Sequence, residues 1–275
     1  MTVINTNTSA AYSQNAMKTN ARFMNKAMEQ LSTGARVNSA ADDAAGLAIS
    51  QNMTSQIRGL NMAIRNVNDG INMMQTAEGA MVEQSNMLQR MRELAIQAMN
   101  GTYSDTQRGY LDKEFQQLTS QINQIATETL WNDQTLLNGA GGSSGTFSFQ
   151  GGQDSGQTIT VTIGAMTTSA LFSGASVNIS SGGSATAALD VISSALETIN
   201  EQRAAIGAGI NRMEYTADNL ANISSNQTQS RSTIVDTDYA IATTQLAKTQ
   251  IIQQASTAML AQANQQAQSV MALLK

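Results

Sequence analysis

Hydrophobic residues recur at every seventh position along much of the first half of the chain. The repeat is unbroken between Ile49 and Ala98. A seven-residue apolar repeat is typical of a helix that packs along a narrow seam. At ~1.5 Å per residue a helix over this stretch would be about 75 Å long, which predicts an elongated molecule. The residues of this seam are Met53, Leu60, Val67, Met74, Met81 and Leu88.

Two further helical patterns follow in the middle and second half of the chain. A turn at residues 100–102 precedes apolar residues that alternate at spacings of four and three from Leu111 to Ile125. This arrangement predicts an antiparallel helical hairpin with the first long helix. The same alternation resumes after residue 184, and it predicts another long helix. Its first seam residues are Leu189, Ile192, Leu196 and Ile199.

The two ends of the chain carry weaker seams that are rich in Ala, Gln and Asn. Few large apolar side chains are available there to offset an ordering entropy of about 1–2 kcal/mol per residue. We therefore expect these ends to become ordered helices only when other copies of the chain pack against them. The residues predicted to make this assembly contact are Met17, Met24, Leu31, Ile252, Met259 and Leu273.

The central segment has a different pattern. A glycine-rich run at residues 139–145 breaks the helices, and apolar residues then alternate with Ser or Thr around Phe147 and Val161. Period-two alternation with β-branched residues predicts short strands. If this insert is peripheral, a deletion between Gly141 and Gly183 should be tolerated better than a polar substitution in a helical seam.

Together these patterns predict a mainly α fold, an elongated antiparallel coiled-coil helical bundle with a small central β-hairpin insert. The predicted organisation is a terminal helix, a long helix with its hairpin, a β-rich insert, a second long helix and a second terminal helix. The corresponding segments are residues 1–40, 41–138, 139–184, 185–234 and 235–275.

The composition of the chain excludes most metal-dependent and His-dependent chemistry. The chain contains no Cys, His or Pro, so it has neither the usual zinc and haem ligands nor a His-based catalytic pair. A net charge of −5 opposes general nucleic-acid binding, and no apolar run is long enough to cross a membrane. The N-terminus does not have the pattern of a cleaved signal peptide. We predict no catalytic residue, no cofactor, no metal, no nucleic-acid partner and no membrane insertion.

Acidic pairs and the glycine run have simple structural interpretations. Asp42 and Asp43 are adjacent, so on a helix they cannot share a proton or an ion, and they are expected to cap a helix or face solvent. Asp236 and Asp238 are interpreted in the same way. The glycine run lacks the GK[ST] ending of a phosphate-binding loop, and it is expected to form a turn.

Four blocks resemble one protein family. Residues 31–50 (LSTGARVNSAADDAAGLAIS) closely resemble the N-terminal signature of bacterial flagellins, and residues 89–97 (QRMRELAIQ) are similar to a second flagellin block. Residues 219–224 and 253–264 are similar to the C-terminal blocks. Two departures are Val235, where the family often has a basic residue, and residues 265–268, where a proline is common. The central insert has no diagnostic match.

The resemblance implies a structural subunit of the bacterial flagellar filament, used for swimming and lying outside the cell. The terminal helices would form the inner D0 layer of the filament, and the long helices with a β-hairpin would form the D1 layer around it. Export would use the flagellar type III apparatus without a cleaved signal peptide. The implied partners are other flagellin subunits, hook–filament junction and filament cap proteins, and a flagellin export chaperone.

The resemblance also implies a contact with a host receptor. Arg90 and Leu94 are four residues apart and share a helical face, and we expect both to be exposed because the seam residues Leu88 and Ala95 point elsewhere. In similar flagellins these positions, with a Glu matching Glu114, contact the Toll-like receptor that senses flagellin. The same surface is covered between subunits in the filament.

Two other functions compete with the filament subunit. A hook–filament junction protein shares the helical framework, and it would not polymerise into long filaments. A secreted enzyme on a flagellin scaffold would need a zinc-binding HExxH motif, which a chain without His cannot contain.

Overall fold

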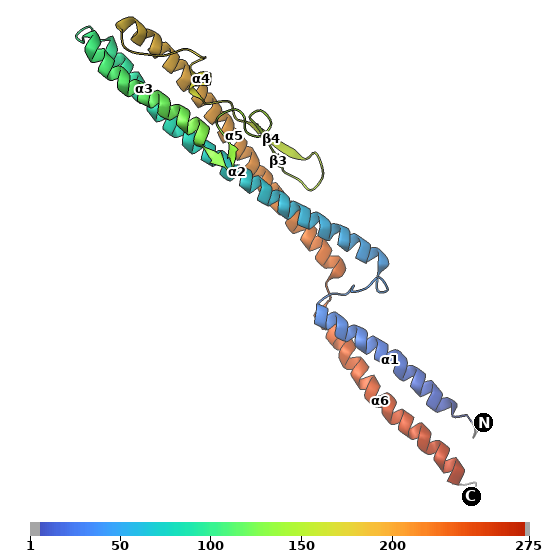
Figure 1. Cartoon of the computed structure of the whole chain (residues 1–275). Helices are drawn as coiled ribbons and strands as arrows, with labels where there is room; N and C mark the ends of the chain where they lie inside the picture. The colour runs from blue at the N-terminus through green and yellow to red at the C-terminus, as the bar shows by residue number, and fades with distance from the viewer. Residues whose placement is uncertain (1–5, 273–275) are drawn as a thin grey trace. The chain divides into compact units, whose positions relative to one another are not determined.

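The computed structural model describes residues 6–272, with side chains described up to residue 265. It divides into two compact units (Figure 1). Unit 1 comprises Met1–Ile57 and Ser225–Lys275, and unit 2 comprises Arg58–Ser224. The described residues form six helices and four short strands, which confirms the predicted mainly α fold with a small β insert. The elements are α1 (Thr8–Thr33), α2 (Ala44–Met99), α3 (Asp105–Glu128), β1 (Leu130–Trp131), β2 (Gln134–Thr135), β3 (Thr146–Gln150), β4 (Thr158–Thr162), α4 (Thr168–Leu171), α5 (Gly182–Val235) and α6 (Tyr239–Ala272).

In unit 2, α2, α3 and α5 share one hydrophobic core (Figure 1). The buried amide of Gln84 on α2 donates to the carbonyl of Ile122 on α3 at 3.2 Å. On the other side of α2, Glu78 pairs with Arg203 of α5 at 3.6 Å. Helix α2 therefore has two helical neighbours. Of the expected seam residues, those fully buried are Leu60, Val67, Met74, Met81, Leu88, Ile192 and Ile199, whereas Met53, Leu189 and Leu196 are half-buried.

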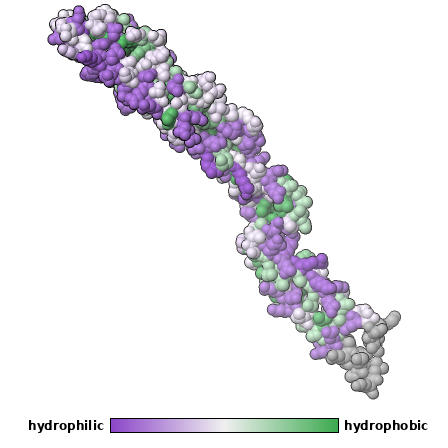
Figure 2. All heavy atoms as spheres, in the orientation of Figure 1, coloured by the Kyte–Doolittle hydropathy of each residue, from purple (hydrophilic) through white to green (hydrophobic). Residues whose placement is uncertain are grey.

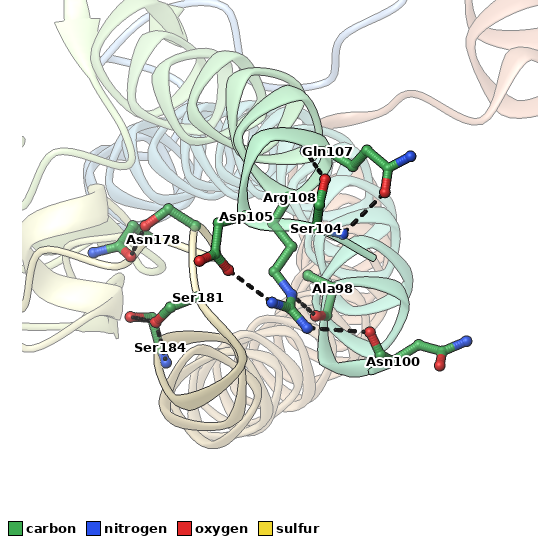
Figure 3. Close-up of polar contacts among 10 residues, drawn as sticks. Ala98, Asn100, Ser104, Asp105, Gln107, Arg108, Asn178, Ser181 and Ser184 are labelled. Atoms are coloured by element: carbon green, nitrogen blue, oxygen red, sulfur yellow. Dashed lines mark hydrogen bonds and ion pairs between the residues drawn. The ribbon is translucent and has the colours of Figure 1, made fainter. Parts of the chain in front are cut away.

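Arg108, in the first turn of α3, caps the C-terminal end of α2 (Figure 3). The Arg108 guanidinium donates to the carbonyls of Ala98 at 2.8 Å and Asn100 at 3.2 Å, and pairs with Asp105 at 2.8 Å. A cation at a helix C-terminus satisfies its free carbonyls and complements its dipole. The helix that supplies this arginine begins with a complete capping box, in which Ser104 and Gln107 bond each other's backbone. The α2–α3 turn is thus fixed by side chains.

The central insert belongs to the core of unit 2. Strands β3 and β4 pair as an antiparallel hairpin, and apolar side chains from the hairpin and the following residues join the helical core. Gln202 of α5 both accepts from the Gly164 amide at 3.1 Å and donates to the Thr162 carbonyl at 2.8 Å. The expectation that this segment is peripheral is therefore wrong. The buried residues of the segment are Phe147, Ile159, Val161, Ile163, Met166, Leu171, Phe172 and Ile179.

Unit 1 contains the antiparallel pair of α1 and α6 (Figure 1). Their contact contains a buried polar group: the Asn20 amide donates to the Thr249 carbonyl at 2.8 Å and to Gln253 Oε1 at 3.3 Å. Helix α1 ends at Gly34, whose φ of 71° is the left-handed conformation that favours glycine. Beyond it, the Gly34 carbonyl accepts from the Thr237 amide at 3.0 Å.

Candidate interaction surfaces

The outward face of α6 is apolar. Ile241, Ile252 and Met259 lie within about 20° of one another around the helix at ~100° per residue, and they are 69%, 38% and 63% exposed. The face of α6 that meets α1 carries the buried Ala242 and Thr249 and the half-buried Leu246 and Leu260. Large apolar side chains exposed on one face of a helix mark a surface on which another macromolecule can pack.

Helix α1 adds to this exposed apolar surface of unit 1. Tyr12 is 80% exposed, Phe23 54% and Met28 48%. Figure 2 shows hydrophobic residues, in green, on the surface of this pair of helices. Of the residues expected to mediate assembly, Met17, Met24 and Leu31 are half-buried towards α6, Ile252 and Met259 face outward, and Leu273 lies outside the described residues.

In unit 2, Arg90 joins two carboxylates on the surface. Its guanidinium lies 2.8 Å from Glu93 on the same helix and 3.0 Å from Glu114 on α3. The hydrogen bond to Glu93 and then that to Glu114 raise the pKa of Arg90 above its ordinary value. All three side chains remain about half-exposed, so the cluster presents a fixed pattern of charge to solvent.

Leu94 does not join this surface. It is 1% exposed and belongs to the hydrophobic core, so the expectation that it is exposed beside Arg90 is wrong. At ~100° per residue Leu94 lies about 120° around the helix from Leu88, whereas Arg90 lies about 160° away. Because α2 packs against α3 as well as α5, its buried arc is wide enough to include Leu94 and stops short of Arg90.

A groove runs between α2 and α5 beside this cluster. Ile96, which is 53% exposed, and the half-buried Leu196 give the groove an apolar floor. Its charged residues are one arginine and three glutamates. We call it the acidic groove; its lining is Gln89, Arg92, Glu93 and Ile96 from α2, and Ser193, Leu196, Glu197, Asn200 and Glu201 from α5.

The remaining acidic candidates have structural roles. Asp43 accepts from the Gly46 amide at 2.8 Å near the start of α2, and Asp238 accepts from the Ala240 amide at 2.8 Å at the start of α6. Asp42 pairs with Lys26 at 2.8 Å, and this contact, helped by the Ser39 amide, lowers its pKa to about 2. Asp236 accepts from the Ser232 hydroxyl at 2.6 Å. These contacts confirm the capping interpretation for Asp43 and Asp238.

The described residues contain no group of three or more His, Cys, Asp or Glu side chains placed to hold a metal ion. Over residues 6–272 no helix combines the length and hydropathy needed to cross a membrane.

Comparison with known families identifies the chain. The model of the bacterial flagellin N-terminal helical region matches residues 4–141, and that of the C-terminal helical region matches residues 189–274. The chain belongs to the bacterial flagellin family. A flagellin from Halalkalibacterium halodurans is 43% identical over 274 residues, which cover 99% of this chain and 100% of that protein.

Other flagellins extend the comparison. The flagellar filament core protein flaB2 of Brachyspira hyodysenteriae is 39% identical over 284 residues, covering 99% of this chain and 100% of that protein. The crystal structure of Bacillus cereus flagellin superposes with a TM-score of 0.51 at 33% identity, covering 57% of this chain and 88% of that one. Over the matched 57% of the chain, the fold is therefore shared with a solved member of the family.

Sequence patterns did not reveal the acidic groove. Ile96 is the one signal that could have done so, because it is a large apolar residue outside the heptad seam on an otherwise charged face of α2. The groove also depends on how α5 is aligned along α2. The spacing of apolar residues within either helix gives no information on that alignment.

Proposed function

We propose that this flagellin is a structural subunit that assembles with copies of itself into the helical filament of the bacterial flagellum, for swimming motility and without catalysis. The observation that carries the proposal is the outward apolar face of α6 formed by Ile241, Ile252 and Met259. Relatives that match over the full length are named as flagellin and as a filament core protein. We infer that the chain, as a filament subunit, lies outside the cell.

The energetics favour assembly. Full burial of an Ile or Met side chain stabilises by about 1.5–3 kcal/mol, and α6 leaves Ile241 and Met259 mostly exposed and Ile252 partly exposed. Its contact with α1 fully buries only small or polar groups such as Asn20 and Thr249 and leaves larger apolar side chains such as Met24 and Leu246 half-buried. Packing of this apolar face between neighbouring subunits would supply the burial that the isolated pair of helices lacks.

Membership of the family supports a set of partners for export and assembly. We infer that the chain leaves the cell through the flagellar type III apparatus without a cleaved signal peptide, bound beforehand by an export chaperone. In the filament it would meet a hook–filament junction protein at one end and a cap protein at the other. The exposed apolar residues of α6 give a chaperone a surface to cover before assembly.

We also propose that Arg90 and Glu114 contact the animal Toll-like receptor for flagellin, and that neighbouring subunits cover them in the filament. Their ion pair at 3.0 Å fixes both side chains at the surface of unit 2. Arginine is enriched among residues that dominate binding energy at interfaces. Soluble monomer should therefore activate the receptor, and cross-linked filament should activate it poorly.

The assembly proposal is tested by making the α6 face polar. The Ile252→Gln, Met259→Gln variant should lose growth onto filament fragments, while the circular dichroism of its monomer stays unchanged. Leu130→Gln is the matched control, because Leu130 is 48% exposed but lies in unit 2, and it should grow normally. Normal growth of the α6 variant would refute the assignment of this face to assembly.

A further inference from the structure

The sequence contains two Asn–Gly pairs, Asn100–Gly101 and Asn138–Gly139. In such a pair the backbone nitrogen of the glycine can attack the side-chain amide carbon of the asparagine, because the glycine has no side chain to shield that nitrogen. The reaction needs an asparagine side chain that can turn over the following peptide bond and a glycine that can move with it. The structure gives the two pairs different surroundings.

Asn100 and Gly101 lie in the turn that follows α2, and both are exposed. The contacts that fix this turn reach the Asn100 backbone carbonyl, which accepts from Arg108 at 3.2 Å and from the Tyr103 amide at 3.3 Å. The Asn100 side chain accepts from the Thr102 amide at 3.3 Å, and in Figure 3 it points away from Arg108. A Cβ added at Gly101 would meet no atom within 4 Å. This pair therefore has room to react.

The second pair is held much more closely. The Asn138 side-chain oxygen accepts from the Thr135 hydroxyl at 2.7 Å and from the Ala140 amide at 2.8 Å. Asn138 and Gly139 are both half-buried, and a Cβ added at Gly139 would lie 2.8 Å from Ala165 Cβ. Neither residue can therefore move far unless this loop opens.

We propose that Asn100 is a site of spontaneous deamidation and that the fold protects Asn138 from the same reaction. The Gly101 nitrogen bonds to Asn100 Cγ, and its proton passes to the side-chain nitrogen, which leaves as ammonia. The product is a succinimide ring, and one water molecule then opens it. Attack of the water at Cγ gives aspartate. Attack at the α-carbonyl gives isoaspartate, in which the main chain runs through the former side chain.

The neighbouring arginine can hold the isoaspartyl product. Ring opening at the α-carbonyl leaves a carboxylate where the Asn100 carbonyl oxygen now accepts from Arg108. The Arg108 side chain is 14% exposed, and the new anion would exchange a hydrogen bond to a neutral carbonyl for a stronger one to a carboxylate. Either product adds one negative charge to the α2–α3 turn.

The test follows both asparagines in full-length monomer that is kept at mildly alkaline pH in water labelled with heavy oxygen, then digested for mass spectrometry. Asn100 should become an acid carrying one labelled oxygen more than about tenfold faster than Asn138, because the loop around Asn138 must first open locally. In urea-unfolded chain the two rates should become similar. Equal rates in the folded chain, a difference that persists in urea, or an Asn100 that reacts only when unfolded would each overturn the proposal.

Gly101→Ala is the matched variant. The φ of Gly101 is not in the left-handed region, and the added methyl group has open space, so circular dichroism should be unchanged. This variant should keep the Asn100 amide over the interval in which the unaltered chain loses it. Protein isoaspartyl methyltransferase with labelled S-adenosylmethionine should then methylate residue 100 of the unaltered chain and not that of the variant. Equal methylation of both would refute attack by the Gly101 nitrogen. These measurements use monomer alone, so their failure would leave the proposed assembly function standing.

Discussion

The hairpin of β3 and β4 packs closely against glycines of the helices in unit 2. Replacing such a glycine by alanine adds one methyl group at the contact and so tests the packing. At Gly209 on α5, an added Cβ would lie 3.1 Å from Val161 Cγ2 and 3.4 Å from its Cγ1. Val161 is 8% exposed and β-branched, so it has little rotamer freedom with which to move away. Gly207, two residues earlier on the same helix, has no atom within 4 Å of the corresponding position.

These two glycines should therefore respond oppositely to alanine. Gly→Ala in a helix interior is worth about 1 kcal/mol of helix propensity, and Gly207→Ala should gain it in full. At Gly209 the same gain is opposed by overpacking, which costs about 1–3 kcal/mol, so Gly209→Ala should be neutral or destabilising by up to about 2 kcal/mol. Gly207→Ala is therefore expected to be more stable than the unaltered chain, and Gly209→Ala no more stable than the unaltered chain.

A second pair of glycines on α2 repeats the comparison. An added Cβ at Gly70 would lie 2.9 Å from Phe149 Cδ1, whereas at Gly79 it would meet nothing within 4 Å. Urea denaturation followed by circular dichroism on all four alanine variants gives the free energies of unfolding. If Gly209→Ala and Gly70→Ala stabilised the chain as much as Gly207→Ala and Gly79→Ala, the hairpin would not be seated on the helices as described.

Three further predictions concern other parts of the chain. Deleting residues 141–183 should abolish the cooperative unfolding transition of unit 2 because it removes core side chains; a deletion variant that kept the transition would contradict this. Leu94→Ala should destabilise by about 2–5 kcal/mol in urea denaturation, whereas Arg90→Ala should leave stability nearly unchanged and weaken signalling in a Toll-like-receptor reporter assay; full signalling by Arg90→Ala would remove Arg90 from the contact. Asp42 has a pKa lowered from 3.8 to about 2 by Lys26, so its ionised form favours the folded state above pH 3.8, and this contribution is lost as pH falls towards 2. Asp42→Asn should therefore flatten the loss of stability across that interval, measured by urea denaturation at successive pH values; an unchanged slope would show that the ion pair contributes nothing.

The long helices were predictable because their seams repeat over many turns. The residues from Leu60 to Leu88 at seven-residue spacing are buried, and the turn at Asn100 and Gly101 separates α2 from α3 as the pattern indicates. Packing against a single partner surface is enough to explain such a repeat. They gave no information on how many partners a helix has, and for that reason Leu94 was assigned to the wrong environment.

The insert and the terminal helices show what local patterns omit. Period-two alternation indicated the β3 and β4 strands, but nothing in it shows that Phe147 and Ile163 complete a helical core. The two-residue strands β1 and β2 are too short to have a detectable period. On α6, Ile252 and Met259 form a clear apolar pattern, and the sequence cannot distinguish a face meant for α1 from one meant for another molecule.

Growth on filament fragments, followed by electron microscopy, tests the central claim most directly. Purified full-length chain added to short flagellar filament fragments should extend them without limit. A hook–filament junction protein would add a short segment and stop. Fragments that stay at their starting length, or that gain only a terminal segment, would contradict the account of this chain as the filament subunit.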